Sequence, residues 1–345
     1  MVVTVSPEES ISFSSLNGDV QLRGILSLPR SASSNIPLVI LVAGSGEVDR
    51  NENSRLAQLN VFNKLAEALA KAGIASLRYD KRGVGESVTT PTGGPCERGL
   101  YHKAGVSELM RDVVAAGRFV ACSEECKGAG IALDKVFVCG HSDGALMMPL
   151  IYREMVADAV CPTPKGCIFL CGFGETLPHA MVFQRNKMAD SLEASNGLWG
   201  FLLRLLVDPA KLRDESQSRK LFHQMSQSPT LALGLVKNPY NWFREHGELD
   251  RDALYVGLTC HILAIGGGKD FQTSPEYCEE GAAAKLVPRA ASLKSLVFLN
   301  MTHVLRDLEG PMDPLQGRGV YIKQGGQDLK HELTHAIISF ILSLP

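Results

Sequence analysis

Short apolar runs alternate with stretches of helical periodicity along most of the chain. Residues 37–43 read P-L-V-I-L-V-A, a continuous apolar run of the length expected for a parallel strand buried on both faces. Similar runs occupy residues 74–79, 136–139, 167–172, 260–265 and 293–301. Between the first two runs, apolar residues recur at helical spacing at Leu59, Phe62, Leu65 and Leu69. This alternation predicts a doubly wound, mostly parallel α/β sheet.

Two segments depart from the alternation. Residues 11–30 alternate polar and apolar on either side of Asn17-Gly18, which predicts two antiparallel strands at the edge of the sheet. Residues 175–257 show no clear strand and are rich in helix formers, where a short link between two sheet strands would otherwise be expected. We therefore expect a core made of residues 1–174 and 258–345, with an inserted helical cap at residues 175–257.

Composition limits the partners and the compartment. Of the 345 residues, 45% are hydrophobic and 21% charged, and the net charge of −2 gives no attraction to nucleic acid or to an anionic membrane. No apolar run reaches the ~18 residues of a membrane span, and the first ten residues lack the pattern of a secretory signal. Nine cysteines scattered through predicted strands are typical of free thiols. We expect a cytoplasmic protein.

A G-x-S-x-G motif gives the first candidate for catalysis. Residues 140–144 read G-H-S-D-G, directly after strand formers and before the helix-forming run A-L-M-M. In a nucleophile elbow, a serine occupies a strained turn between strand and helix, with its hydroxyl raised above the sheet. Gly140 and Gly144 suit the close backbone approach at such a turn. Ser142 is therefore the predicted nucleophile.

A serine hydroxyl is a poor nucleophile unless a base takes its proton and a third group orients that base. His303 follows the last predicted strand, and Asp270 follows the strand before it. Because parallel strands end at one edge of the sheet, both residues are expected beside Ser142, in the chain order Ser, Asp, His. Glu175, just after the preceding strand, is the alternative acid, whereas His261 lies inside a predicted strand.

The oxygen that becomes negatively charged during acyl transfer needs preorganised backbone donors. One predicted donor is the amide of Asp143, which follows the nucleophile. The other is the amide of Ser45, in the loop after residues 37–43, where Gly44 and Gly46 let the backbone approach a substrate.

These motifs, at their spacing, make the chain similar to the α/β-hydrolases, in the branch of serine aminopeptidase-like and dienelactone-hydrolase-like esterases. The matching segments are residues 43–51 (A-G-S-G-E-V-D-R-N), residues 78–87 (R-Y-D-K-R-G-V-G-E-S), the elbow, and the pair of Asp270 and His303. The resemblance implies that three residues brace the loop beside the site without taking part in chemistry, namely Asp80, Arg82 and Ser87.

Two positions depart from the pattern of that branch. Ala43 stands where many relatives carry histidine, so the loop that follows must be supported in another way. Asp143 places a carboxylate next to a donor that must stabilise negative charge. We expect this carboxylate to cap the following helix, where the helix dipole favours a negative group, and to point away from the substrate.

A second motif indicates different chemistry. Residues 331–335 read H-E-L-T-H, which matches a zinc-protease signature. The apolar residues of the surrounding segment form one helical stripe, and at about 100° per residue His331 and His335 fall nearly opposite it. We therefore expect both histidines to face solvent, and we expect no metal site.

The predicted cap is more apolar than a lid needs for its shape alone. It contains both tryptophans of the chain, Trp199 and Trp242, and Phe243 follows the second. Ligand pockets are mostly apolar with a few placed polar groups. These three residues are predicted to line a pocket for a medium-sized hydrophobic acyl group or ring.

Together, these features predict a serine hydrolase that cleaves a small-molecule carboxylic ester or thioester through an acyl-enzyme, with no cofactor. Fold and triad do not fix the reaction. An aminopeptidase, a lyase, an acyltransferase and a small-molecule receptor of the same fold are the alternatives. An acidic cap pocket that binds a substrate amine would favour the aminopeptidase.

Overall fold

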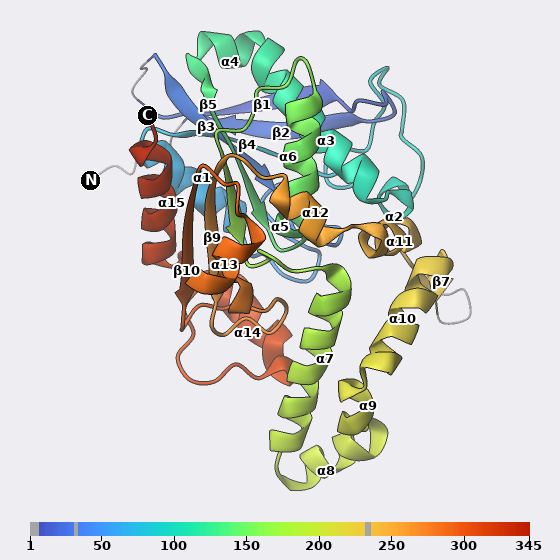
Figure 1. Ribbon diagram of the computed structural model, residues 1–345. Coiled ribbons are helices and arrows are strands. Elements are labelled where there is room, and N and C mark those ends of the chain that lie inside the picture. The colour runs from blue at the N-terminus through green and yellow to red at the C-terminus, as the bar shows by residue number, and fades with distance from the viewer. Residues whose placement is uncertain (1–6, 31–33, 232–235) are drawn as a thin grey trace.

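An eight-stranded sheet forms the centre of the protein in the computed structural model, which describes residues 7–30, 34–231 and 236–345 (Figure 1). The order of the strands in the sheet is β1-β2-β4-β3-β5-β6-β9-β10. Their bounds are β1 (Glu8–Ser14), β2 (Gln21–Ser27), β3 (Ile36–Val42), β4 (Ala75–Tyr79), β5 (Ile131–His141), β6 (Gly166–Leu170), β9 (His261–Gly267) and β10 (Ser292–Phe298). β1 and β2 are antiparallel, as is the pair of β2 with β4, and the other neighbours are parallel. The predicted mostly parallel α/β sheet is confirmed.

The continuous apolar runs become the central strands of this sheet. Every residue of β4 and β6 is buried, and β3 exposes only Pro37 in part. Helices cover both faces, so successive positions of these strands are apolar. Because β3, β5, β6, β9 and β10 run in parallel, their carboxyl ends share one edge, and the loops that follow them lie close together.

The helices of the core form a layer on each face of the sheet. α1 (Val61–Lys71) and α15 (His331–Ser343) pack on one face, and α3 (Val106–Cys122) and α6 (Met148–Ala157) pack on the other. Shorter helices are α2 (Leu100–Lys103), α4 (Glu124–Gly128), α5 (Asp143–Leu146), α13 (Glu280–Leu286), α14 (Gly317–Gln324), and the 3₁₀ turns η1 (Glu276–Cys278) and η2 (Pro314–Gln316). In the ranges that the structure describes, no helix combines the length and the apolar character needed to cross a membrane.

A largely helical segment is inserted between β6 and β9. It contains α7 (Leu177–Ala194), α8 (Gly197–Leu206), α9 (Pro209–Arg213), α10 (Glu215–Gln227), α11 (Tyr240–Glu248), α12 (Arg251–Val256), and the short strands β7 (Thr230–Leu231) and β8 (Val236–Lys237). The sequence pattern did not predict these two strands. α7 and α10 contact each other and extend away from the sheet, with α8 at the tip of this arm (Figure 1).

A buried polar contact joins the inserted segment to the core. Trp242 Nε1, on α11, donates to one carboxylate oxygen of Asp143 at 3.0 Å, and His246 Nε2 lies 2.8 Å from the other. All three side chains are buried, and a buried carboxylate needs such donors. The expectation that Asp143 caps the following helix was wrong. Ser142 occupies the capping position of α5, and the side chain of Asp143 points to α11 instead.

We predict that Asp143→Ala lowers the free energy of unfolding by about 3 kcal/mol, because it removes one partner of a buried, hydrogen-bonded pair. The change should also loosen α11 and expose Trp242. In a Trp199→Phe background, where Trp242 is the remaining tryptophan, its fluorescence emission should then shift to longer wavelength.

The control for this prediction lies in the same inserted segment. Asp190 forms an exposed ion pair with Arg213, and such pairs contribute little to stability. Asp190→Ala should therefore leave both the unfolding free energy and the emission of Trp242 nearly unchanged. An emission spectrum of Asp143→Ala that matches the parent would contradict the anchoring contact.

Candidate active site

Ser142 forms the sharp turn between β5 and α5. It follows β5 directly and adopts φ 55° and ψ −119°, and a positive φ of this kind is unusual for a residue with a side chain. A Cβ on Gly140 would lie 2.3 Å from the carbonyl oxygen of Gly144, and one on Gly144 would lie 2.2 Å from the carbonyl oxygen of Val42. Only glycine fits at these two positions, which is the geometry expected of a nucleophile elbow.

The structure brings the three predicted residues of the triad together. His303, in the loop after β10, places Nε2 2.9 Å from Ser142 Oγ. Its Nδ1 lies 2.7 Å from Asp270 Oδ2, in the loop after β9. Burial alone would raise the pKa of Asp270, but the charge of His303 and hydrogen bonds from Gln272 and Thr273 lower it below its ordinary value. Asp270 is therefore a stable anionic partner for the imidazole.

The alternative acid, Glu175, takes no part in this chain of contacts. Its carboxylate accepts a hydrogen bond from the backbone N–H of Ser274 at 3.0 Å. Burial raises the pKa of Glu175 to about 7, against the effect of that hydrogen bond. Asp270, rather than Glu175, is thus the carboxylate that meets His303.

The two predicted oxyanion donors belong to segments that meet at Ser142. Asp143 is the first residue of α5, so its N–H has no partner within the helix. Gly44 packs against the nucleophile, since a Cβ at this position would lie 3.2 Å from Ser142 Cβ. In the described part of the chain, neither the N–H of Asp143 nor that of Ser45 has an acceptor. The N–H groups of Ser45 and Asp143 are therefore free, and they belong to two segments, the loop after β3 and the elbow, that contact each other.

A buried glutamate and histidine connect the parts of this site, and the sequence analysis missed them. Glu52 Oε1 accepts from the N–H of Gly44 at 2.8 Å, and Oε2 lies 2.7 Å from His141 Nδ1. His141 Nε2 is 2.8 Å from the carbonyl oxygen of His303, which can only accept, so Nε2 carries a proton. Burial opposes both charges, yet their mutual attraction lowers the pKa of Glu52 and raises the pKa of His141. The only sequence signal was that Glu52 directly follows the motif at residues 43–51, and no pattern in the sequence identified His141 as its partner.

The residues that the resemblance assigned to bracing are engaged with one another and with neighbouring elements. Asp80 accepts from the side chain of Arg50 and from the backbone N–H of Glu86 at 2.8 Å. Ser87 Oγ donates to the carbonyl oxygen of Asp80 at 2.8 Å. Arg82 forms a buried pair with Asp112 on α3, with 2.7 Å between Nη2 and Oδ1. These contacts fix the loop after β4 on the sheet.

The aromatic residues predicted to line a pocket occupy different places. Trp242 and Phe243 are buried and pack edge to face, with ring centres 4.8 Å apart. Neither lines the cavity between the inserted segment and the core, and Trp242 donates a hydrogen bond to Asp143. The side chain of Trp199, on α8, lies outside the described residues. The pocket lined by these aromatic residues stays a prediction.

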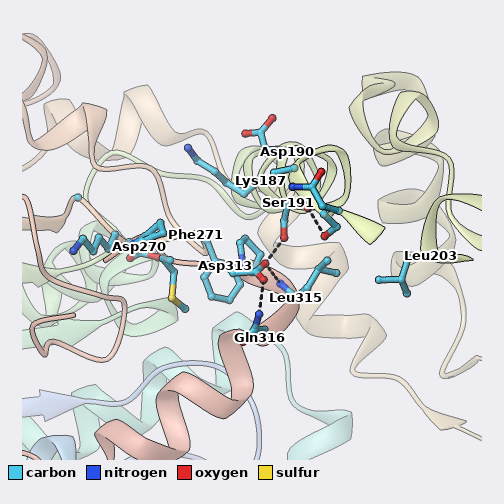
Figure 2. Close-up of a pocket in the computed structure, with 17 residues that line it drawn as sticks. Lys187, Asp190, Ser191, Leu203, Asp270, Phe271, Asp313, Leu315 and Gln316 are labelled. Atoms are coloured by element: carbon cyan, nitrogen blue, oxygen red, sulfur yellow. Dashed lines mark hydrogen bonds between the residues drawn. The ribbon is translucent and has the colours of Figure 1, made fainter. Parts of the chain in front are cut away.

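A cavity of about 970 Å³ lies between the inserted segment and the core, and of the three candidate catalytic residues only Asp270 lines it. Its walls come from α7, α8, the loop after β9 and the segment around η2, and Asp270 and Phe271 lie at its edge (Figure 2). Apolar side chains alternate with charged ones, and the lining includes Lys187, Asp190, Leu203, Asp313 and Leu315. Ser142 does not line it.

The residues that the structure describes include one cluster with the chemistry of metal ligands. One group, made of Cys171, Asp270 and His303, brings its ligand atoms within 4.8 Å of one another. Two of its members already bond to each other, and His303 also contacts Ser142. His331 and His335 are exposed on α15, as the helical phase predicted. The side chains near Ser142 are thus arranged for proton transfer.

Comparisons with known proteins agree with this geometry. The family described as serine aminopeptidase, S33, matches residues 32–169. Esterase EstD of Thermotoga maritima is 26% identical over 312 residues, which cover 89% of this chain and 62% of EstD. The chain therefore spans less than two thirds of the length of that relative.

Solved structures show the same fold at low sequence identity. Est1E from Butyrivibrio proteoclasticus, with ferulic acid bound, has a TM-score of 0.54 at 15% identity and covers 96% of this chain and 98% of its own. A thermostable carboxyl esterase from Bacillus coagulans has a TM-score of 0.52 at 17% identity and covers 99% of both chains. With its sheet order, its elbow and its likeness to these solved structures, the chain has the α/β-hydrolase fold.

Proposed function

We propose that the protein is a serine hydrolase that cleaves a small-molecule carboxylic ester, or a thioester, through an acyl-enzyme. The observation that carries this proposal is the unbroken set of contacts from Ser142 Oγ through His303 to Asp270. The free amides of Ser45 and Asp143 beside the hydroxyl add the second requirement of acyl transfer.

In the proposed mechanism, Ser142 Oγ attacks the carbonyl carbon of the ester while His303 Nε2 takes the hydroxyl proton. Asp270 accepts from Nδ1–H and stabilises the imidazolium that forms. The tetrahedral oxygen accepts hydrogen bonds from the amides of Ser45 and Asp143. His303 then donates its proton to the departing alcohol or thiol, and a water molecule repeats the sequence to release the acid and restore Ser142.

The inserted residues 175–257 are proposed as a cap on a core of residues 1–174 and 258–345. Two contacts support this division. Gln184, on α7, donates to the carbonyl oxygen of Gln272 at 2.9 Å, close to Asp270 in sequence. On the other side, α11 binds Asp143. The proposed cap therefore contacts the loop after β9 and the start of α5, both of which carry residues of the site.

All nine cysteines are free, which supports a reducing compartment such as the cytoplasm.

The esterase names of EstD and of the Bacillus coagulans enzyme favour ester cleavage. The serine aminopeptidase match favours peptide cleavage next to a free amine, but it covers residues 32–169 and ends before the inserted segment. An aminopeptidase needs a free acidic group near the nucleophile to bind that amine. Asp143, the carboxylate beside Ser142, is already bound by Trp242 and His246. We therefore place ester cleavage first.

We predict that Ser142→Ala abolishes ester hydrolysis and covalent labelling by a fluorophosphonate, because no other group at the elbow can attack. The protein should stay folded with an unchanged melting temperature, since the hydroxyl is partly exposed and makes no core contact. Hydrolysis at the parent rate in this variant would rule out the proposed mechanism.

We predict that kcat/KM rises severalfold for each two carbons added to the acyl chain of a p-nitrophenyl ester, until the binding region fills. Each buried methylene contributes roughly 0.8 kcal/mol. Aminoacyl p-nitroanilides provide the comparison, and they should be cleaved far more slowly. A flat response from acetyl to octanoyl esters contradicts an acyl-binding cap, and a strong preference for the anilides would assign the aminopeptidase reaction.

We predict that a metal chelator leaves ester hydrolysis unchanged, because the proposed chemistry uses only Ser142, His303 and Asp270. The check is the rate before and after dialysis against the chelator. A loss of activity that zinc restores would return the H-E-x-x-H segment at residues 331–335 to consideration.

A further inference from the structure

A buried lysine beside the loop after β3 has no part in the mechanism above. Lys81, just after β4, is 7% exposed and donates from Nζ to the carbonyl oxygens of Gly44, at 2.7 Å, and of Gly46. The ammonium group also lies 5.0 Å from the centre of the Tyr101 ring. Among the described residues it joins no ion pair. A buried cation without a carboxylate partner is costly, so the position of the Lys81 ammonium group against two carbonyl oxygens needs an explanation.

The two carbonyl contacts determine where the neighbouring amide points. In a trans peptide unit, the C=O of one residue and the N–H of the next point in opposite directions. By holding the oxygen of Gly44, Lys81 directs the N–H of Ser45 away from itself. Gly44 packs against Ser142, so this N–H is left free on a segment that touches the nucleophile. The second contact, to Gly46, holds the other end of the same short loop.

We propose that Lys81 is a positioning residue, which holds residues 44–46 so that the Ser45 N–H points at the oxygen that becomes negative when Ser142 attacks an ester. The inference rests on the proposed function and deepens it. It also accounts for Ala43, because the ammonium group of Lys81 supports the loop from the side of β4.

The charge of Lys81 links this role to pH. Burial lowers the pKa of Lys81 to about 8, although the carboxylates of Asp143, Glu52 and Glu47 favour its charged form. The other groups around it are the Tyr101 ring and three histidines that contact these carboxylates, namely His246 with Asp143, His141 with Glu52 and His102 with Glu47. Above a pH of about 8 the ammonium loses its proton, and its charge-assisted hydrogen bonds become weaker neutral ones. A neutral amine still donates, so kcat should step down severalfold to a lower plateau rather than to zero.

The test replaces Lys81 by methionine, which keeps the length of the side chain and removes the donors. For Lys81→Met, we expect kcat to fall by about 10- to 100-fold, with KM within about twofold. This loss is smaller than the roughly 100- to 1,000-fold that follows removal of an oxyanion donor, because the Ser45 N–H is kept but less well directed. Affinity for an alkyl trifluoromethyl ketone, whose adduct with Ser142 carries an oxyanion, should fall by the same factor. The step in kcat near pH 8 should disappear.

Lys330→Met is the matched control. Lys330 is also largely buried, bonds to Asp307 at 3.0 Å and lies 5.4 Å from the Phe298 ring, but it contacts no residue of the site. This variant should keep the parent kcat, KM and pH step. Amide hydrogen exchange of Gly44, whose N–H donates to Glu52, gives a readout without catalysis, and it should be slow in the parent and faster in Lys81→Met only.

A folded Lys81→Met with unchanged kcat, unchanged ketone affinity and unchanged exchange overturns the inference. If Lys81→Met does not fold, the parent enzyme decides, because a kcat that shows no step near pH 8 overturns the inference as well. A parent that neither hydrolyses esters nor binds the ketone contradicts the proposed function instead. In that case, the hydrogen exchange of the two variants still tests whether Lys81 holds the loop.

Discussion

The positive-φ backbone of Ser142 is the constraint on which the rest of the site depends. A residue with a side chain in this conformation costs on the order of 1–3 kcal/mol, so its surroundings must maintain it. The N–H of Ser142 donates to the carbonyl oxygen of Leu170 at 2.9 Å, which ties the turn to β6, and α5 starts directly after it. At Gly140 and Gly144 the neighbouring backbone is so close that a side chain at either position would clash with it. The direction of the hydroxyl is thus fixed before any substrate arrives.

Ionisable side chains surround this turn in pairs, and each pair links the elbow to a different loop. Glu52 and His141 connect the loop after β3 with the backbone of His303. Asp270 holds His303 from the loop after β9. In a water-poor region such contacts are stronger than in solvent, and an unpaired member would be costly. Because losing a partner would cost free energy, these contacts hold the loops in fixed positions relative to one another.

The sequence revealed the elements whose signals are local. Ser142, Asp270 and His303 each follow an apolar run, and parallel strands that end at one edge bring such positions together whatever lies between them. Glu175 has the same local signal, and only a tertiary contact, the N–H of Ser274, separates it from Asp270. Lys81 and Glu52 were missed because their roles depend on backbone groups supplied by distant segments. The partners of Asp143 were missed for the same reason, since a dipole argument considers only the helix that follows.

The contact between Asp143 and α11 also limits how this fold can be recombined. A carboxylate beside the nucleophile is tolerated while Trp242 and His246 supply its two hydrogen bonds. A chimera that received residues 175–257 from a relative without such donors would keep a carboxylate without hydrogen-bond donors next to Ser142 and the proposed oxyanion site. The acid in the elbow and the donors of the inserted segment therefore have to be exchanged together. The central residues of the G-H-S-D-G motif thus indicate which inserted segments this core can accept.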